Sequence, residues 1–142
     1  MACRIDNGPN QMTLSGELRT LRVLLIDDDE WIRDSLLSFF QGEACSIAVF
    51  ETAEEGLTEF RKSMFDIAIV DYRLPGMNGL EFIRAIKGLS PNARTVLMTA
   101  YWNAEILKEA NSVGIDDFVK KPFTSEAIVA SLSTVLCQQL PR

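Results

Sequence analysis

Five short apolar runs alternate along the chain with segments that have the period of an amphipathic helix. The runs contain little polar alternation, which is typical of strands buried on both faces of a parallel sheet. They are Val23–Ile26, Ile47–Phe50, Ile67–Val70, Val96–Met98 and Phe118–Val119. The pattern therefore predicts an α/β protein made of five βα units.

The segments between the runs place apolar side chains three and four residues apart, which predicts five helices with one buried face each. Thr52 followed by Glu55 forms a capping box at the start of the second helix. Gly42, Gly88 and Gly114 mark the ends of the first, third and fourth helices. Repeated βα units imply right-handed crossovers, with helices on both faces of the sheet.

The alternating pattern begins near Leu21 and continues to Leu140 without a second linker. We expect a mobile leader over residues 1–20 and one domain over residues 21–140. The 142 residues are enough for one domain with a real hydrophobic core. No apolar run approaches the roughly 18 residues of a membrane span, and residues 1–20 lack the apolar segment of a secretion signal.

The composition removes several classes of chemistry. The chain has no histidine, which excludes a Ser-His-Asp triad, an imidazole base and a histidine-ligated metal. Its net charge of −6 speaks against direct binding of nucleic acid. The three cysteines have no metal-ligand spacing and indicate reduced thiols, so we expect a cytoplasmic protein.

Polar side chains follow the predicted strands at their carboxyl ends, where the ligand crevice of an open α/β sheet lies. Asp27, Asp28 and Asp29 follow the first strand, Asp71 the third, Thr99 the fourth and Lys121 the fifth. Crowded carboxylates repel one another unless protons or a hard cation such as Mg²⁺ relieve them. A carboxylate can also attack phosphorus without a base, because it is ionised at neutral pH. Each residue alone also has a structural interpretation, such as capping a helix.

Four motifs at these strand ends resemble the receiver domain of bacterial two-component response regulators. They are Val23–Asp29, Ile69–Gly79, Met98–Ala100 and Val119–Phe123, and the resemblance extends over about residues 21–138. It implies a three-layer, doubly wound, flavodoxin-like (βα)5 fold with strand order 2-1-3-4-5. A cis bond before Pro122 is frequent in the family.

The resemblance also implies roles for individual residues. Asp71 would accept a phosphoryl group, and Asp27, Asp28, Asp71 and the carbonyl of Arg73 would hold Mg²⁺. Thr99 would move towards the phosphoryl group, and Lys121 would compensate its charge. The movement of Thr99 would let the ring of Phe118 turn inward. A phenylalanine that simply fills the core is the plainer alternative. Asp29 would cap a helix and Lys120 would point elsewhere.

The bulky Arg73 and Tyr101 would slow loss of the phosphate by shielding it, and Trp102 stands either near the site or over the next helix.

The partners implied are a sensor histidine kinase or histidine phosphotransfer protein, and a downstream protein or effector domain. A homodimer would form through the fourth helix, fifth strand and fifth helix. Whether the chain is a stand-alone receiver or a piece of a longer regulator stays open. Such a domain phosphorylates and dephosphorylates itself but is not a conventional enzyme.

Two alternatives have sequence support. A receiver-like module that works without phosphate has the same fold. A phosphatase of the haloacid dehalogenase type would use Asp27 and Asp29 with the later pair Asp116-Asp117, but Trp31 stands where its motif has Thr or Val. A flavin carrier lacks its hydroxyl- and Gly-rich phosphate loop here, and the GxxxxGK motif of a P-loop NTPase is absent.

Overall fold

Each predicted strand is followed by a helix in the computed structural model, which describes residues 20–43, 45–101 and 103–137. Most of the predicted leader therefore lies outside the described residues. The elements are β1 (Arg22–Ile26), α2 (Glu30–Gly42), β2 (Ser46–Phe50), α3 (Ala53–Ser63), β3 (Ile67–Asp71), α4 (Gly79–Leu89), β4 (Arg94–Thr99), α5 (Ala104–Val113), β5 (Asp117–Lys120) and α6 (Ser125–Cys137).

The five strands form one parallel sheet in the order β2-β1-β3-β4-β5, which confirms the predicted α/β fold. The three central strands are almost fully buried, because helices cover both faces. Parallel strands with short apolar runs need this double cover. All five carboxyl ends consequently meet at one edge of the sheet, where the ligand crevice of such folds lies.

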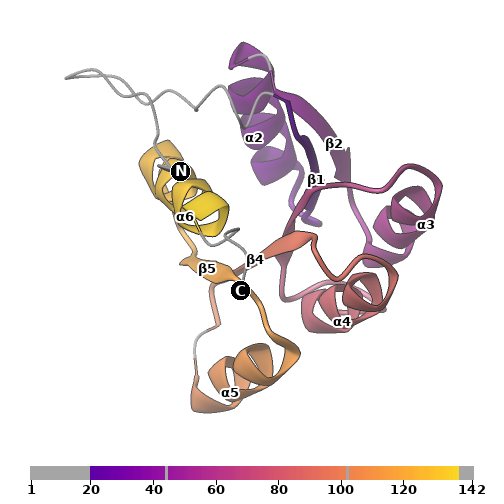
Figure 1. The fold of residues 1–142 in the computed structure, drawn as a ribbon. Helices are drawn as coiled ribbons and strands as arrows, with labels where there is room; N and C mark the ends of the chain where they lie inside the picture. Colours follow the sequence, from indigo (N-terminus) through magenta and orange to yellow (C-terminus); the bar gives the residue numbers. More distant parts are fainter. Residues whose placement is uncertain (1–19, 44, 102, 138–142) are drawn as a thin grey trace.

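The two faces of the sheet have separate apolar cores. On one face α2 and α6 contribute Leu36, Phe40, Ile128 and Leu132, which pack with Leu25 of β1. On the other face α3, α4 and α5 contribute Leu57, Ile83 and Ala110, which pack with Leu24 of β1 and Leu97 of β4. The chain thus folds into three layers, as Figure 1 shows.

Polar caps define where the helices begin. The predicted capping box of Thr52 and Glu55 is present at α3. A second box, Asn78 with Glu81, starts α4, and the pattern of apolar positions does not reveal it. The α5 helix ends at Gly114 in the left-handed conformation, which glycine adopts without strain.

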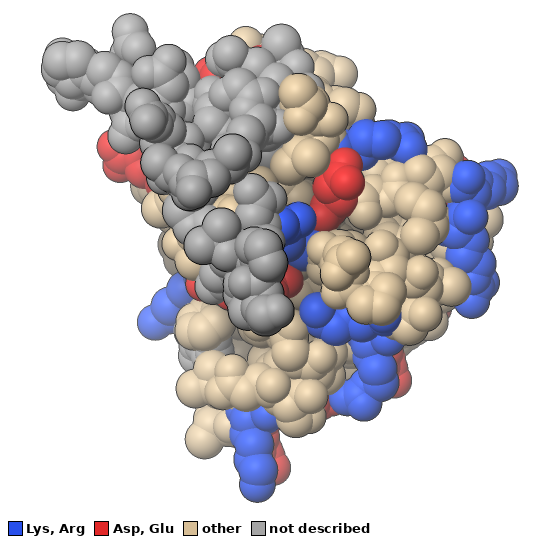
Figure 2. All heavy atoms as spheres, in the orientation of Figure 1, with Lys and Arg blue, Asp and Glu red and all other residues tan. Residues whose placement is uncertain are grey.

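Several basic side chains lie in the last turns of helices. The last turn of α3 carries Arg61 and Lys62, and that of α4 carries Lys87, where cations favour the helix dipole. Figure 2 shows Lys and Arg in several separate groups on one face of the molecule. Among the described helices, none combines the length and the apolar character needed to cross a membrane.

Candidate phosphoacceptor site

Three carboxylates from two neighbouring strands meet at the carboxyl edge of the sheet. Asp27 and Asp28 directly follow β1, and Asp71 is the last residue of β3. Because β1 and β3 pair in parallel with Ile26 opposite Val70, the residues that follow lie side by side. Oxygens of the three carboxylates lie within 4.8 Å of one another. Asp27 and Asp71 are buried, whereas Asp28 is exposed.

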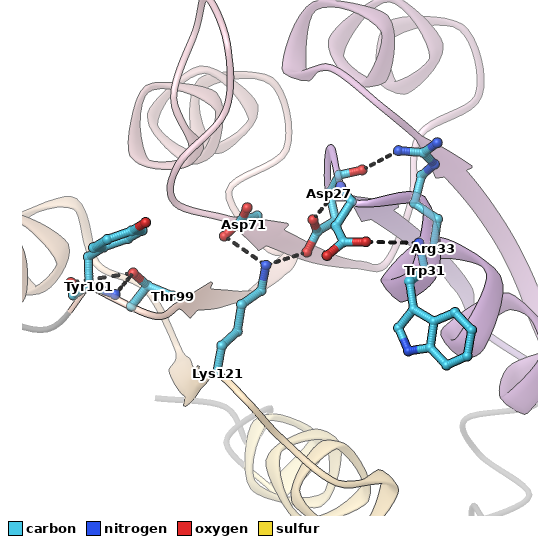
Figure 3. A network of polar contacts seen from close by, with 8 residues as sticks. Asp27, Trp31, Arg33, Asp71, Thr99, Tyr101 and Lys121 are labelled. Carbon is cyan, nitrogen blue, oxygen red and sulfur yellow. Dashed lines mark hydrogen bonds and ion pairs between the residues drawn. The ribbon is translucent and has the colours of Figure 1, made fainter.

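The ammonium group of Lys121 binds two of these carboxylates (Figure 3). Its Nζ lies 2.7 Å from Oδ2 of Asp27 and 3.3 Å from Oδ1 of Asp71. Lys121 follows β5, and the bond to Pro122 is cis, as the resemblance implied. The neighbouring Lys120 is exposed. The lysine therefore spans the site from the far strand and forms its shorter contact with Asp27, which the sequence did not indicate.

Burial and neighbouring charges shift the pKa values of Asp27, Asp71 and Lys121. Burial above all, and next the Asp27 charge, raise the pKa of Asp71 from 3.8 to about 6, although Lys121 opposes this. Burial likewise raises the pKa of Asp27 against the opposing contacts with Lys121 and Asp29. Burial lowers the pKa of Lys121, but the hydrogen bond and charge of Asp27 and the charge of Asp71 outweigh it, so that this pKa is raised. At neutral pH Lys121 is charged and Asp71 is mostly ionised.

Backbone contacts hold Asp27 in place. Its Oδ1 accepts a hydrogen bond of 2.9 Å from the N–H of Asp29, and its carbonyl accepts one of 2.9 Å from Nη1 of Arg33. Asp29 caps α2 through its own side chain, which accepts from the N–H of Trp31, as the sequence predicted. The role of Arg33 was not predicted, because a basic residue on an amphipathic helix reads as a solvated side chain.

Thr99 lies at the end of β4, buried, with its hydroxyl directed to the following loop. Its Oγ1 accepts a hydrogen bond of 2.8 Å from the N–H of Tyr101 and donates one of 3.3 Å to the Tyr101 carbonyl. The ring of Tyr101 in turn lies under Arg73, whose Cζ is 4.1 Å from the ring centroid. The two bulky residues that the sequence singled out are thus in direct contact. Trp102 lies outside the described residues.

Phe118 is 39% exposed on the edge strand β5. It pairs with Leu97 of β4 and so belongs to the face that α3, α4 and α5 cover. The alternative, in which Phe118 fills the core, is wrong for this structure, because β5 is an edge strand and leaves part of the ring open to solvent.

The three carboxylates fit a hard divalent cation. Mg²⁺ takes oxygen ligands, usually from one or two carboxylates together with waters and phosphate oxygens. Burial raises the pKa of two of these carboxylates, Asp27 and Asp71, in spite of Lys121, and the positive charge of a bound cation would favour their ionised forms. The donor set, all oxygen and without sulfur or imidazole, matches magnesium rather than zinc.

Comparison with known proteins identifies the family. The model of the response regulator receiver domain matches residues 23–133. The chain belongs to this family.

Curated relatives of this receiver domain are longer proteins. It is 31% identical over 116 residues to a cyclic di-GMP phosphodiesterase of Thermotoga maritima, covering 82% of this chain and 31% of the relative. It is 27% identical over 119 residues to the transcriptional regulatory protein FixJ of Bradyrhizobium diazoefficiens, covering 84% and 58%. The chain thus spans about a third to somewhat over half the length of these relatives.

Solved receiver domains share the whole fold. A CheY-like receiver domain protein from Methanospirillum hungatei superposes with a TM-score of 0.80 at 28% identity, over 84% of this chain and 95% of the other. The chemotaxis protein CheY4 of Vibrio cholerae gives a TM-score of 0.77 at 27% identity, over 81% and 98%. These matches confirm the CheY-like, flavodoxin-like fold.

The geometry of this receiver domain argues against the phosphatase alternative. Asp116 binds the N–H of Thr95, at 2.8 Å, and Thr95 lies near the start of β4, whereas Thr99 ends it. The pair Asp116-Asp117 therefore lies at the amino edge of the sheet, opposite Asp27 and Asp71. A phosphatase of that type would need its later acidic pair beside the first aspartates.

Proposed function

We propose that this receiver domain takes a phosphoryl group onto Asp71 from a phosphohistidine, in a Mg²⁺-dependent reaction that switches a protein-binding surface. The observation that supports this most is the pairing of Lys121 with both Asp27 and Asp71, beside a third carboxylate. An ammonium and an acidic cation site around one ionised carboxylate suit phosphoryl transfer, which depends on positioning and charge.

Asp71 is the nucleophile of the proposed reaction. One of its carboxylate oxygens forms a bond to phosphorus while the bond from phosphorus to the imidazole nitrogen breaks, and the imidazole leaves with the electron pair. No base is needed, because the carboxylate is already mostly ionised at neutral pH. Lys121 binds a phosphoryl oxygen and compensates its charge.

Asp27, Asp28, Asp71 and the backbone carbonyl of Arg73 would hold the magnesium ion. When bound, the ion neutralises part of the carboxylate and phosphoryl charge. The raised pKa values of Asp27 and Asp71 fit a site that gains from added positive charge.

The switch begins at Thr99. Its hydroxyl is engaged with the backbone of Tyr101 and would leave these bonds to donate to a phosphoryl oxygen. Phe118, exposed in this structure, would then turn inward and change the surface made by α5, β5 and α6. That surface would receive a downstream protein, an effector domain of a longer regulator or a second copy of the chain. A cytoplasmic location and the absence of nucleic-acid binding remain predictions.

Beryllofluoride, which mimics an aspartyl phosphate, tests the proposal with Mg²⁺ present. We expect the wild type to bind it and the variant Asp71→Asn not to bind it, as read from amide chemical shifts. If the wild type responds no more than Asp71→Asn, the phosphate-independent module becomes the better account.

A further inference from the structure

The loop from Tyr72 to Asn78 joins the phosphoacceptor to α4, and both of its ends are fixed. The N–H of Tyr72 donates to the carbonyl of Met98 at 2.8 Å, and the N–H of Gly79 donates to the carbonyl of Tyr72 at 2.9 Å. A Cβ atom on Gly79 would collide with the carbonyl oxygen of Asp71. The start of α4 therefore packs directly against the backbone of Asp71, and a shift of the loop reaches that residue.

A carboxylate from another helix fixes the middle of this loop. Oε2 of Glu54, in the first turn of α3, accepts a hydrogen bond of 2.9 Å from the N–H of Met77. Gly76 has a φ of +74° there, and a Cβ on it would lie 2.6 Å from the same oxygen. The positive φ favours glycine here, and a Cβ would also displace the carboxylate of Glu54.

The charge of Glu54 suits this place. The carboxylate lies in the first turn of α3, and Met77 directly precedes Asn78, the N-cap of α4. Both helices offer N–H groups and the positive end of their dipoles to an anion. The hydrogen bond from Met77 accordingly lowers the pKa of Glu54 below its ordinary value. The hydrogen bond joins α3 to the loop before α4, through residues that are 23 positions apart in the chain.

We propose that Glu54 is a positioning residue of the phosphoacceptor site. It holds the loop 72–78 against α3 and so keeps the backbone of Arg73 in the arrangement that a cation beside Asp71 needs. The inference rests on the proposed function, since it assigns the Arg73 carbonyl to that cation. Glu54 bonds to the backbone N–H of Met77, whereas Lys121 binds the side chain of Asp71, so Glu54 would act on the site through the backbone.

The test compares Glu54→Ala and Glu54→Gln with Glu59→Ala, which removes a carboxylate further along the same helix. Without metal, we expect the amide proton of Met77 to exchange faster in Glu54→Ala and to keep intermediate protection in Glu54→Gln, which retains an acceptor oxygen. In a Mg²⁺ titration, we expect the dissociation constant of Glu54→Ala to rise about tenfold, the lower end of the loss for outer-shell partners of a metal site. Glu59→Ala should change neither result.

The outcomes separate the inference from the proposed function. If the wild type binds Mg²⁺ and Glu54→Ala binds it equally well, the inference is wrong, even when the unfolding temperature of the variant falls. A lower unfolding temperature with unchanged affinity is the result of a purely structural role. If the wild type itself binds neither Mg²⁺ nor beryllofluoride, the proposed function fails, and the positioning role fails with it.

Discussion

Arg73 lies over the ring of Tyr101, with its guanidinium carbon 4.1 Å from the ring centroid. The two residues come from the loops that follow Asp71 and Thr99, so the stack lies beside the proposed phosphoryl group. We expect it to restrict the approach of water to the phosphorus atom. The double variant Arg73→Asn, Tyr101→Ala should then lose phosphate about tenfold faster, which corresponds to about 1.4 kcal/mol of barrier.

The measurement is the rate of phosphate release after the donor has been removed. Arg84→Asn, which changes an exposed arginine of α4, serves as the control and should keep the parent rate. A double variant that loses phosphate no faster than the parent would refute the shielding role.

The pKa of Asp71 predicts a pH-dependent stability difference between the wild type and Asp71→Asn. The pKa is about 6 in the folded protein and about 4 in an unfolded chain. Ionisation of Asp71 therefore destabilises the folded protein. Its contribution lowers the free energy of unfolding as the pH rises from about 4 to 6, and the full loss persists above pH 6. Metal-free Asp71→Asn should be more stable than the wild type at pH 7.5, by about 1–3 kcal/mol, and equally stable near pH 4.

Denaturant unfolding at the two pH values measures this difference. A stability advantage of Asp71→Asn that is the same at both values would show that ionisation of Asp71 is not its cause.

Asp28 is the exposed member of the acidic cluster, and its loss should affect the cation more than the fold. We expect Asp28→Asn to weaken Mg²⁺ binding by about tenfold or more, since a hard cation loses a charged oxygen ligand. The rise of the unfolding temperature with Mg²⁺ concentration measures the affinity. Asp34→Asn, an exposed acid on α2, should leave it unchanged; equal loss in both variants would indicate only a general effect of charge.

Phe118 should lose solvent exposure when the site is occupied. Hydroxyl-radical footprinting, with and without beryllofluoride and Mg²⁺, compares its reactivity in the two states. We expect a fall in the wild type and none in Thr99→Val, which lacks the hydroxyl that links the site to the switch. Protection of Phe118 in both proteins would show that Thr99 does not couple the two.

The sequence predicted the sheet and the gathering of polar side chains at its carboxyl edge, because both leave periodic or positional signals. Buried parallel strands appear as continuous apolar runs, and strand ends at one edge bring Asp27, Asp71, Thr99 and Lys121 together. The structure adds that Lys121 contacts Asp27 more closely than Asp71, because the paths of the loops decide which oxygen the ammonium reaches.

Hydrogen bonds between side chains and backbone groups left no such signal. The bonds from Arg33 to the Asp27 carbonyl and from Met77 to Glu54 join a side chain to a backbone group. A backbone group looks the same at every position of a sequence, so that only the folded geometry reveals its partner. The exposure of Phe118 could not be predicted from the sequence either, because an edge strand has a paired strand on one side only and can leave an apolar side chain partly open to solvent.

The central claim, that Asp71 is the acceptor of a phosphoryl group, is tested most directly by the mass of the intact protein after incubation with acetyl phosphate and Mg²⁺. The account predicts one added phosphoryl group on the wild type, lost again on removal of the donor, and none on Asp71→Asn. An unmodified wild type, or equal modification of both proteins, would contradict it.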